Sequence, residues 1–204
     1  MKITQLKCEC GKTRGELEVH PWSTSRTICN CDDCQTYARF LKNDRILDPY
    51  GGTDILPAPP ADLKITSGIE NLKGARLSPK GLYRWYAGCC DTPVANSPPN
   101  PAMPYVGIVH TFWDATPEQA DQWLGPVFAR IQARYAKGKP PGRVYDKIGL
   151  RPILRILGFL AIATLKRRAE PSPFFKDAQP VVEPYILSKQ ERQANRPPGT
   201  ASDT

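Results

Sequence analysis

Seven cysteines are the residues of this 204-residue chain whose type and spacing could do chemistry. They form three groups, which are Cys8 with Cys10, Cys29 with Cys31 and Cys34, and the adjacent pair Cys89 and Cys90. Thiolates are soft ligands that suit Zn²⁺, and ligands two or three residues apart can face one ion from a single turn of chain. Cysteines so close in sequence make poor disulfide partners. The groups therefore predict metal binding, with one or two zinc ions.

The triplet of Cys29, Cys31 and Cys34 predicts a reactive zinc site. Three thiolates can hold the ion and leave its fourth tetrahedral position open to water, a substrate thiolate or a carbonyl oxygen. Zinc lowers the pKa of an incoming thiol and stabilises developing negative charge. The alternative is a closed structural site that a distant fourth ligand completes.

Cys8 and Cys10 form half a site and need partners far along the chain. Cys89 and Cys90 are the cysteines that remain, and together the four would join an early turn to a late strand. Structural zinc contributes on the order of 10 kcal/mol to the folding of zinc-finger peptides. We expect this second site to stabilise the fold rather than to react.

Other polar residues carry weaker signals. Asp32, Asp33 and Asp54 are candidates for acid, base or metal-orienting roles, although acids in turns are usually solvated or cap helices. His20 and His110 have no cysteine or histidine near them in the sequence, and we expect both to be structural.

The charge of the chain is concentrated in one segment. Residues 126–168 hold eleven Lys or Arg and one acid, Asp146, whereas the whole chain has a net charge of +8. Such a segment can attract anionic lipid, nucleic acid or acidic small molecules, or can simply be a solvated surface. We expect no nucleic acid partner and keep peripheral membrane contact as a hypothesis. The first residues lack the apolar core of a secretory signal, which predicts a cytoplasmic protein with free thiols.

Short strands separated by turns dominate the first half of the chain, as in β-rich domains. Glycine and proline at 51–52, 57–60 and 97–101 mark loops between them. The expected strands span 2–7, 15–19, 26–29, 53–56, 63–66, 82–87 and 105–112.

Three helices are expected. A short one follows the cysteine triplet, from Asp32 to Leu41. A second begins at the capping box of Thr116 and Gln119 and continues along an apolar stripe to Tyr135, before Gly138. The third, over 148–168, is apolar almost all round but too short to span a bilayer. We expect it to be buried against the protein or a second subunit, with an interfacial membrane helix as the alternative.

The pattern predicts an α+β fold, mainly β with C-terminal helices. We expect a zinc-binding domain of short antiparallel strands over 1–115, a helical extension packed on it over 116–194, and a disordered tail over 195–204.

Four stretches carry a family resemblance over residues 5–112. They are Cys8-Glu9-Cys10-Gly11, Cys29-Asn30-Cys31-Asp32-Asp33-Cys34, Gly52-Thr53-Asp54-Ile55 and Cys90-Asp91-Thr92-Pro93. In type, order and spacing they resemble the glutathione-dependent formaldehyde-activating enzyme and centromere protein V family, whose zinc-binding fold is called the β-tent. The stretches 76–81 and 172–175 resemble an uncharacterised bacterial branch that spans nearly the whole chain.

The resemblance implies that Cys29, Cys31 and Cys34 bind a catalytic zinc whose open position receives the thiol of glutathione. It implies a structural zinc on Cys8, Cys10 and Cys90. The family has a second cysteine three residues before Cys90 and a glycine after it, where this chain has Ala87 and Asp91. Either Cys89 substitutes, or Asp91 contributes an oxygen, or the site is incomplete.

The implied reaction is the reversible addition of a small thiol such as glutathione to formaldehyde or another small aldehyde, which makes or breaks a carbon–sulfur bond. We therefore expect a zinc-dependent carbon–sulfur lyase. The alternative is a non-catalytic binding module that zinc holds together. The sequence predicts no oligomeric state.

Overall fold

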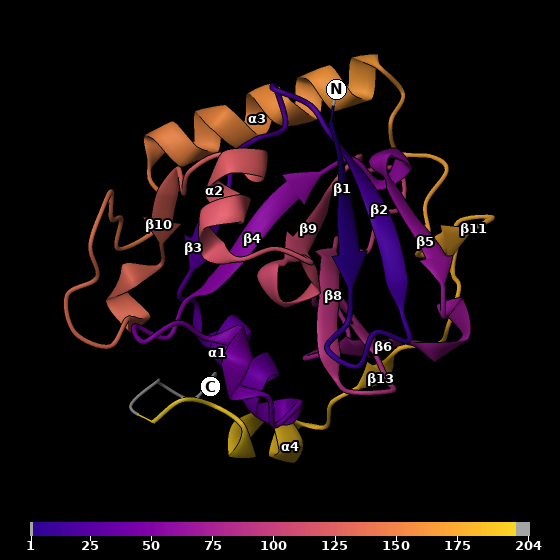
Figure 1. Cartoon of the computed structure of the whole chain (residues 1–204). Helices are drawn as coiled ribbons and strands as arrows, with labels where there is room; N and C mark the ends of the chain where they lie inside the picture. The colour runs from indigo at the N-terminus through magenta and orange to yellow at the C-terminus, as the bar shows by residue number, and fades with distance from the viewer. Residues whose placement is uncertain (1, 199–204) are drawn as a thin grey trace.

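The fold is built on an eight-stranded sheet and a three-stranded sheet in the computed structural model, which describes residues 2–198 (Figure 1). The larger sheet has the order β10-β3-β4-β9-β8-β7-β6-β13, and the smaller has the order β1-β2-β5. Residues with alternating burial form β1 (Lys2–Lys7) and β2 (Arg14–Val19) of the smaller sheet, which β5 (Leu63–Ser67) completes. The other strands are β3 (Thr27–Cys29), β4 (Thr53–Ala58), β6 (Leu72–Arg76), β7 (Tyr83–Ala87), β8 (Thr92–Ser97), β9 (Val106–Val109), β10 (Ala129–Ile131) and β13 (Tyr185–Ile186), with a separate pair β11 (Phe175–Lys176) and β12 (Gln179–Pro180).

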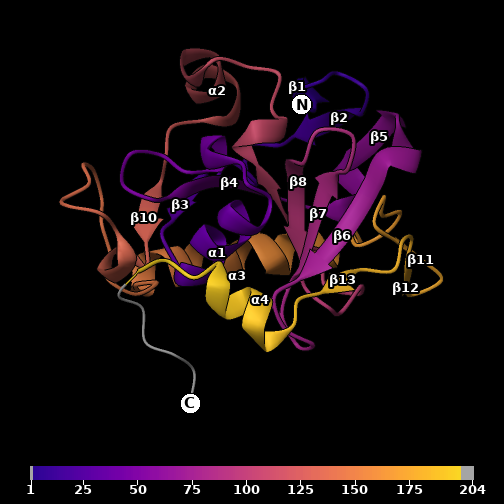
Figure 2. The same cartoon turned by 90° about the horizontal axis from the view of Figure 1, so that it is seen from below.

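Four α-helices complete the described residues, which confirms the predicted α+β class with mainly β structure. They are α1 (Asp32–Phe40), α2 (Pro117–Leu124), α3 (Leu150–Leu165) and α4 (Lys189–Ala194). Helix α4 lies beside α1, where Arg192 donates a hydrogen bond to Asp33 (Figure 2).

The larger sheet presents two different faces because successive side chains of a strand alternate in direction. Trp85 of β7 and Ile108 of β9 are fully buried in the main core, together with Leu6 and Leu17 of the smaller sheet. Trp85 also stacks on Phe174, with ring centroids 5.0 Å apart. The neighbouring residue of β7, Arg84, faces the other side, where the sheet and α3 enclose a cavity.

Each of the strands predicted from the sequence is present within a few residues of its expected bounds. Prediction missed β6 and β8, and it missed β10 to β13 in the second half of the chain. The β8 segment begins with Thr92 and Pro93, and proline is rare inside sheets because it cannot donate to the ladder. The last predicted strand ends early, at Val109, because residues 110–112 form a 3₁₀ turn.

The predicted helix from Thr116 to Tyr135 is wrong in its second half. The capping box of Thr116 and Gln119 starts α2 as expected, but the helix ends at Leu124. Gly125 has φ +82° and is followed by Pro126, which disfavours helical backbone in the residue before it. Ile131 of the apolar stripe instead lies in β10, which pairs in parallel with β3, and Tyr135 lies in a 3₁₀ turn.

The segment from residue 116 onward is integrated into the larger sheet as well as covering it. It supplies both edge strands, β10 beside β3 and β13 beside β6. Of the predicted tail, residues 195–198 lie against α1, where Arg39 donates a hydrogen bond to the backbone oxygen of Arg196 at 2.9 Å. Residues 199–204 of that tail are outside the described residues.

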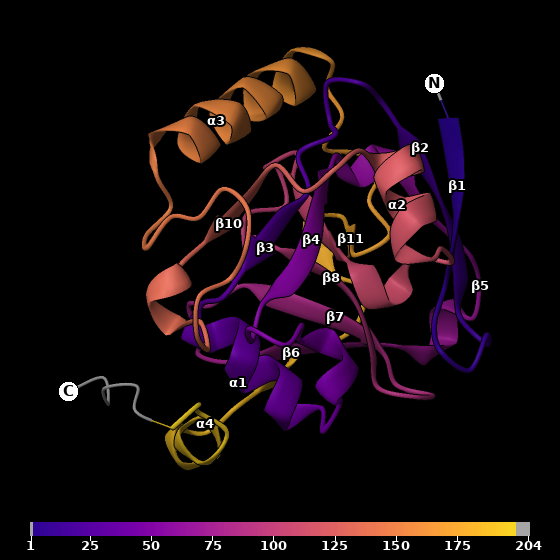
Figure 3. The ribbon, with the colours of Figure 1, turned by 60° about the vertical axis from the view of Figure 1, so that its left-hand side comes forward.

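Helix α3, which was expected to be buried against the protein or a second subunit, packs against the protein along one side. Pro152, Phe159 and Ala163 are its buried side chains, and its opposite side is exposed. Figure 3 shows the helix lying along one edge of the molecule. Within residues 2–198, none of the helices combines the length and apolar character that crossing a membrane requires.

Candidate metal centres

The junction of β3 and α1 brings Cys29, Cys31 and Cys34 together. Cys29 is the last residue of β3, Cys31 is the N-cap of α1, and Cys34 lies in the first turn of that helix. Their Sγ atoms all lie within 4.8 Å of one another. The Cys34 backbone N–H donates to Cys31 Sγ at 3.4 Å. A helix N-terminus favours negative charge, so this junction suits thiolates.

The three thiols differ in how readily they lose a proton. Hydrogen bonds from Cys29 and Cys31, and then the positive charge of Arg84, hold the pKa of Cys34 well below its usual value. Hydrogen bonding to Cys31 and Cys34, with burial, raises the pKa of Cys29 well above its usual value. Cys34 is therefore the thiol of the triplet that loses its proton most readily to a metal.

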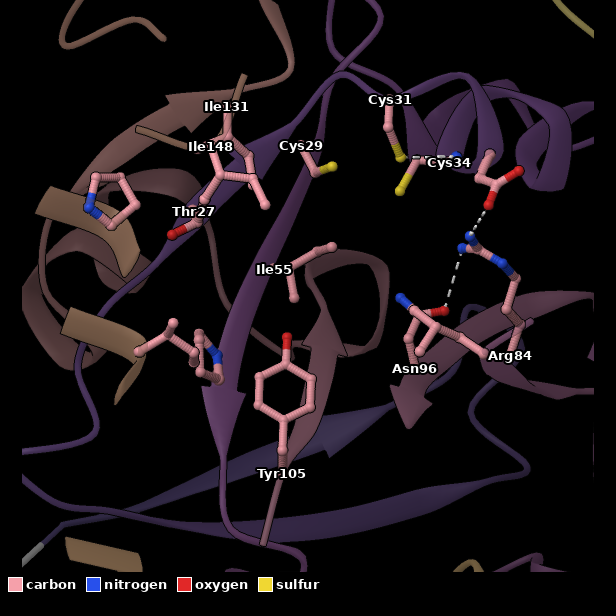
Figure 4. A pocket seen from close by; sticks show the side chains of 15 residues that line it. Thr27, Cys29, Cys31, Cys34, Ile55, Arg84, Asn96, Tyr105, Ile131 and Ile148 are labelled. Carbon is pink, nitrogen blue, oxygen red and sulfur yellow. Dashed lines mark hydrogen bonds and ion pairs between the residues drawn. The ribbon is translucent and has the colours of Figure 1, made fainter. Parts of the chain in front are cut away.

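Arg84 of β7 reaches the triplet from the opposite wall of the cavity (Figure 4). Its side chain is 4% exposed, and it donates a hydrogen bond to Asn96 Oδ1 at 3.4 Å. Asp33 Oδ2 lies 4.0 Å from its Nη2, and the ring of Tyr37 lies 5.2 Å below its guanidinium. Burial alone would lower the pKa of Arg84, but the charge of Cys34 raises it, so a permanent cation faces the sulfurs.

A cavity of about 320 Å³ opens beside the triplet. One face of the larger sheet lines it with alternate residues of each strand, including Cys29 of β3 and Ile55 of β4. Ile148, Pro152 and Ile156 cover it from the side of α3. The cysteines and Arg84 therefore occupy the polar part of a cavity whose other walls are largely apolar.

Tyr105, which precedes β9, directs its hydroxyl into this cavity (Figure 4). Burial, together with the negative charge of Cys29 and Cys34, raises the pKa of Tyr105 above its usual value. The phenol therefore stays protonated at neutral pH and can donate a hydrogen bond to an oxygen atom in the cavity.

The second group of cysteines lies outside this cavity and joins distant parts of the chain. Cys8 and Cys10 are in the turn after β1, and Cys89 and Cys90 are in the turn between β7 and β8. The sulfur–sulfur distances are 3.6 Å from Cys8 to Cys10, 3.8 Å from Cys8 to Cys89, 3.3 Å from Cys10 to Cys89 and 3.8 Å from Cys89 to Cys90. Four sulfurs around one zinc at about 2.3 Å lie about 3.8 Å apart, so the group fits a closed tetrahedral site.

Among the three alternatives for the fourth ligand, the positions of the sulfurs favour Cys89. Its sulfur lies between those of Cys8, Cys10 and Cys90, whereas Asp91 stands outside the sulfur group. Burial and the contact with Cys10 raise the pKa of Cys89 to about 12. A metal would therefore have to displace the proton of this thiol.

Of the three aspartates proposed from the sequence, one lines the cavity and two form ion pairs or hydrogen bonds elsewhere. Asp33 lines the cavity, but Asp32 and Asp54 do not. Asp32 accepts a hydrogen bond from Arg196, and Asp54 accepts one from Arg26, which also binds Asp121.

Neither histidine belongs to a cysteine group, but His20 lies with Glu18 and Asp62 in a separate group that could hold a metal ion. His20 Nε2 is 3.3 Å from Asp62, and His110 Nε2 is 3.2 Å from the backbone oxygen of Arg45.

Sequence analysis missed Arg84, Asn96 and Tyr105, as well as the part of the wall that α3 supplies. The signal available for Arg84 was a single charge inside the otherwise uncharged strand Tyr83–Ala87. For α3 no local signal existed, because contact between residues about 120 positions apart depends on the tertiary fold.

Comparisons with known proteins give a family without an assigned function. A crystal structure of a Rhodobacter sphaeroides protein, a structural genomics target, is 18% identical, with a TM-score of 0.42, and the match covers 60% of this chain and 96% of that one. A search of curated proteins gives no match. The family described as "Family of unknown function (DUF6151)" matches residues 1–185, which is most of the chain. The chain therefore belongs to the DUF6151 family.

Proposed function

We propose that this protein is a zinc-dependent carbon–sulfur lyase that acts on the adduct of a small thiol and an aldehyde. The observation that supports the proposal is the placement of three cysteine sulfurs together on the wall of a cavity, beside a buried arginine. Three thiolates are a ligand set that leaves zinc one position for a substrate. The resemblance to the glutathione-dependent formaldehyde-activating enzymes is part of the same proposal, as is a reducing cytoplasmic location that keeps thiols free.

Bound zinc would supply a lowered pKa for the substrate thiol and a positive charge near the reacting atoms. In the direction of addition, the thiolate sulfur attacks the carbonyl carbon, the C=O π bond breaks, and the oxygen takes up a proton. Tyr105 can donate a hydrogen bond to that oxygen because its phenol remains protonated. Arg84 offsets the negative charge of the cysteines, and the apolar walls exclude water from the reacting groups.

Native mass spectrometry of single-cysteine variants tests the proposal. We expect two zinc ions in the wild type and one in each of Cys31→Ser and Cys89→Ser. Glutathione should add to the wild type and to Cys89→Ser but not to Cys31→Ser, because only the triplet has a free zinc position. NMR exchange spectroscopy measures catalysis as the rate at which the thiol adduct of formaldehyde exchanges with the free thiol and aldehyde.

Two results would contradict the proposal. A zinc-free wild type would remove its chemical basis. Two zinc ions without any thiol binding or exchange would favour the alternative, a binding module that zinc holds together. Circular dichroism of each variant checks that the fold is retained.

A further inference from the structure

The cavity beside the cysteine triplet has walls that suit a carbon chain. Seven aliphatic or proline residues line it, among them Ile55, Ile148 and Ile156. Formaldehyde has no apolar part that could use these walls. A substrate with a carbon chain would cover these apolar walls and exclude water from them. Each methylene group buried in this way strengthens binding by up to about fourfold.

The polar groups of the cavity are few and lie near the sulfurs. Among the described residues that line it, Arg84 is the one cation, and it already faces Cys34 and Asp33. A thiol such as glutathione carries two carboxylates, and a carboxylate placed against apolar walls without a cation loses its hydration. The charged part of such a thiol would have to remain outside, so the interior is left for the other half of the adduct.

We propose that this cavity holds the carbon chain of an apolar aldehyde, larger than formaldehyde, while the thiol sulfur reaches the cysteine triplet. This inference rests on the proposed function and specifies its substrate class. Ile148, Pro152 and Ile156 contact the carbon chain of the aldehyde and set the preference for its length. Tyr105 directs its hydroxyl toward the carbonyl oxygen of the aldehyde.

The test compares formaldehyde, propanal and hexanal as partners of 2-mercaptoethanol, with the full zinc-loaded chain. We expect kcat/KM to rise by tenfold or more from formaldehyde to hexanal. Hexanal should also shift the NMR signals of the methyl groups of Ile55, Ile148 and Ile156, whereas the exposed Ile3 and Ile69 serve as internal controls. Ile156→Trp should abolish the preference of hexanal over propanal by filling the cavity, whereas Ile69→Trp should leave the preference unchanged.

The outcomes separate this inference from the proposed function. Exchange of formaldehyde with no preference for hexanal overturns the inference and leaves the lyase in place. Absence of exchange with every aldehyde overturns the lyase, and the NMR titration then decides alone whether hexanal occupies the cavity. Unchanged isoleucine signals overturn the inference in either case.

A second inference comes from the outer side of α3, which is independent of the cavity. Leu150, Leu154, Leu157 and Leu165 follow helical spacing along this side and are 69%, 59%, 54% and 85% exposed. We call these four residues the outer leucine row. An exposed row of large apolar side chains on a helix indicates a surface that binds another protein or a membrane.

Positive charge surrounds the outer leucine row. Arg151 on the helix, Lys147 before it and Lys166 and Arg167 after it are exposed. Arg155 is engaged with the protein, because it donates to Ser25 Oγ at 2.7 Å. A second copy of this chain would bring two such basic segments face to face, which like-charge repulsion disfavours. An anionic lipid surface complements the charge and accepts the leucines.

We infer that α3 docks the protein on the surface of an anionic membrane, with the helix lying in the plane of the interface. Its 16 residues give a length of about 24 Å, which suits an interfacial position. The outer leucine row enters the boundary of the acyl chains while the basic residues contact the headgroups.

Co-sedimentation of the full chain with vesicles tests this docking. Vesicles of phosphatidylcholine and phosphatidylglycerol in a 7:3 ratio should bind the wild type at least tenfold more strongly than pure phosphatidylcholine, with weaker binding at high salt. Replacing Leu154 and Leu157 together by Glu should lower this binding at least tenfold, and Ile69→Glu should not.

Two results would overturn the inference about the membrane. One is equal, weak sedimentation of the wild type and the double variant. The other is a wild-type dimer in light scattering that the double variant loses, because the second copy would then be the occupant of this surface. Arg151→Glu, which keeps the outer leucine row, gives an independent check by weakening binding to the anionic vesicles.

Discussion

Arg84 places a permanent positive charge against the three thiols of the triplet. Its strand contributes Trp85 to the core on one face and Arg84 to the cavity on the other. The guanidinium is held by Asn96 and by the ring of Tyr37, so it cannot easily move away from the sulfurs. A buried cation fixed in this way favours the deprotonated thiols that a metal requires.

Replacing this charge should weaken zinc binding at the triplet. We expect Arg84→Gln to lower the zinc affinity of Cys29, Cys31 and Cys34 by about 10- to 100-fold, the usual effect of removing an outer partner of metal ligands. Titration against a chromophoric chelator measures it. Lys139→Gln, at an exposed lysine outside both cysteine groups, is the control that should change neither site. Equal zinc affinity in Arg84→Gln and the wild type would show that the charge has no such role.

Strand β10 completes the wall of the cavity beside Cys29, and it can form because α2 ends before it. Because the chain leaves the helix at Gly125, residues 129–131 can pair with β3. Ile131 of β10 then lines the cavity, and its backbone oxygen accepts a hydrogen bond from Asn30 between the cysteines at 3.0 Å. A continuous helix to Tyr135 would leave β3 without this neighbour.

Gly125 should therefore resist substitution. At φ +82° and ψ 161°, it occupies a region that is essentially limited to glycine, so Gly125→Ala should lower the free energy of unfolding by about 1–3 kcal/mol. Space is not the reason, since the nearest atom to an added Cβ is Thr24 Cβ at 3.6 Å. Gly158→Ala in α3 is the matched control, and alanine there should stabilise by up to about 1 kcal/mol. Urea denaturation compares the two, and equal stability of Gly125→Ala and the wild type would refute the argument.

At the scale of the whole molecule, α3 connects the two inferences, because it covers the cavity on one side and carries the outer leucine row on the other. Its attachment to the sheets depends on a few polar contacts. Arg168, just after the helix, forms an ion pair with the fully buried carboxylate of Asp62 and a second one with Glu18 at 3.4 Å. The Arg168 backbone oxygen also accepts a hydrogen bond from Ala61 at 3.2 Å.

Loss of this ion pair should destabilise the fold in a pH-dependent way. Arg168→Met leaves a buried carboxylate with a weaker partner, so we expect a loss of about 1–3 kcal/mol at pH 7. Burial already raises the pKa of Asp62, against the opposing effect of Arg168. A carboxylate whose pKa is raised in the folded state lowers the stability of the fold as the pH rises through that pKa. Removing Arg168 strengthens this effect, so the loss of unfolding free energy in Arg168→Met, relative to the wild type, should grow from pH 4 to pH 7. Thermal unfolding at both pH values measures this, with Lys166→Met as an exposed control; a deficit independent of pH would contradict it.

The amino-acid sequence alone determined the local features of this protein. The spacing of Cys29, Cys31 and Cys34 places three sulfurs at one strand–helix junction, and alternating side chains define most of the strands. These features depend on residues within one turn or one strand. The wrong extension of α2 belongs to the same scale, because Gly125 and Pro126 end the helix locally although the apolar stripe continues past them.

The tertiary structure decided which residues surround the triplet, because it brings Arg84 and α3 to Cys29, Cys31 and Cys34. The meeting of Cys8 and Cys10 with Cys89 and Cys90 was expected from the number of cysteines, but only the tertiary structure gives its geometry. The physical reason is that such contacts depend on the packing of two sheets and a helix around shared cores. The spacing of residues along the chain does not determine that packing. By contrast, the geometry of a single turn is enough to bring three cysteines of one short segment together.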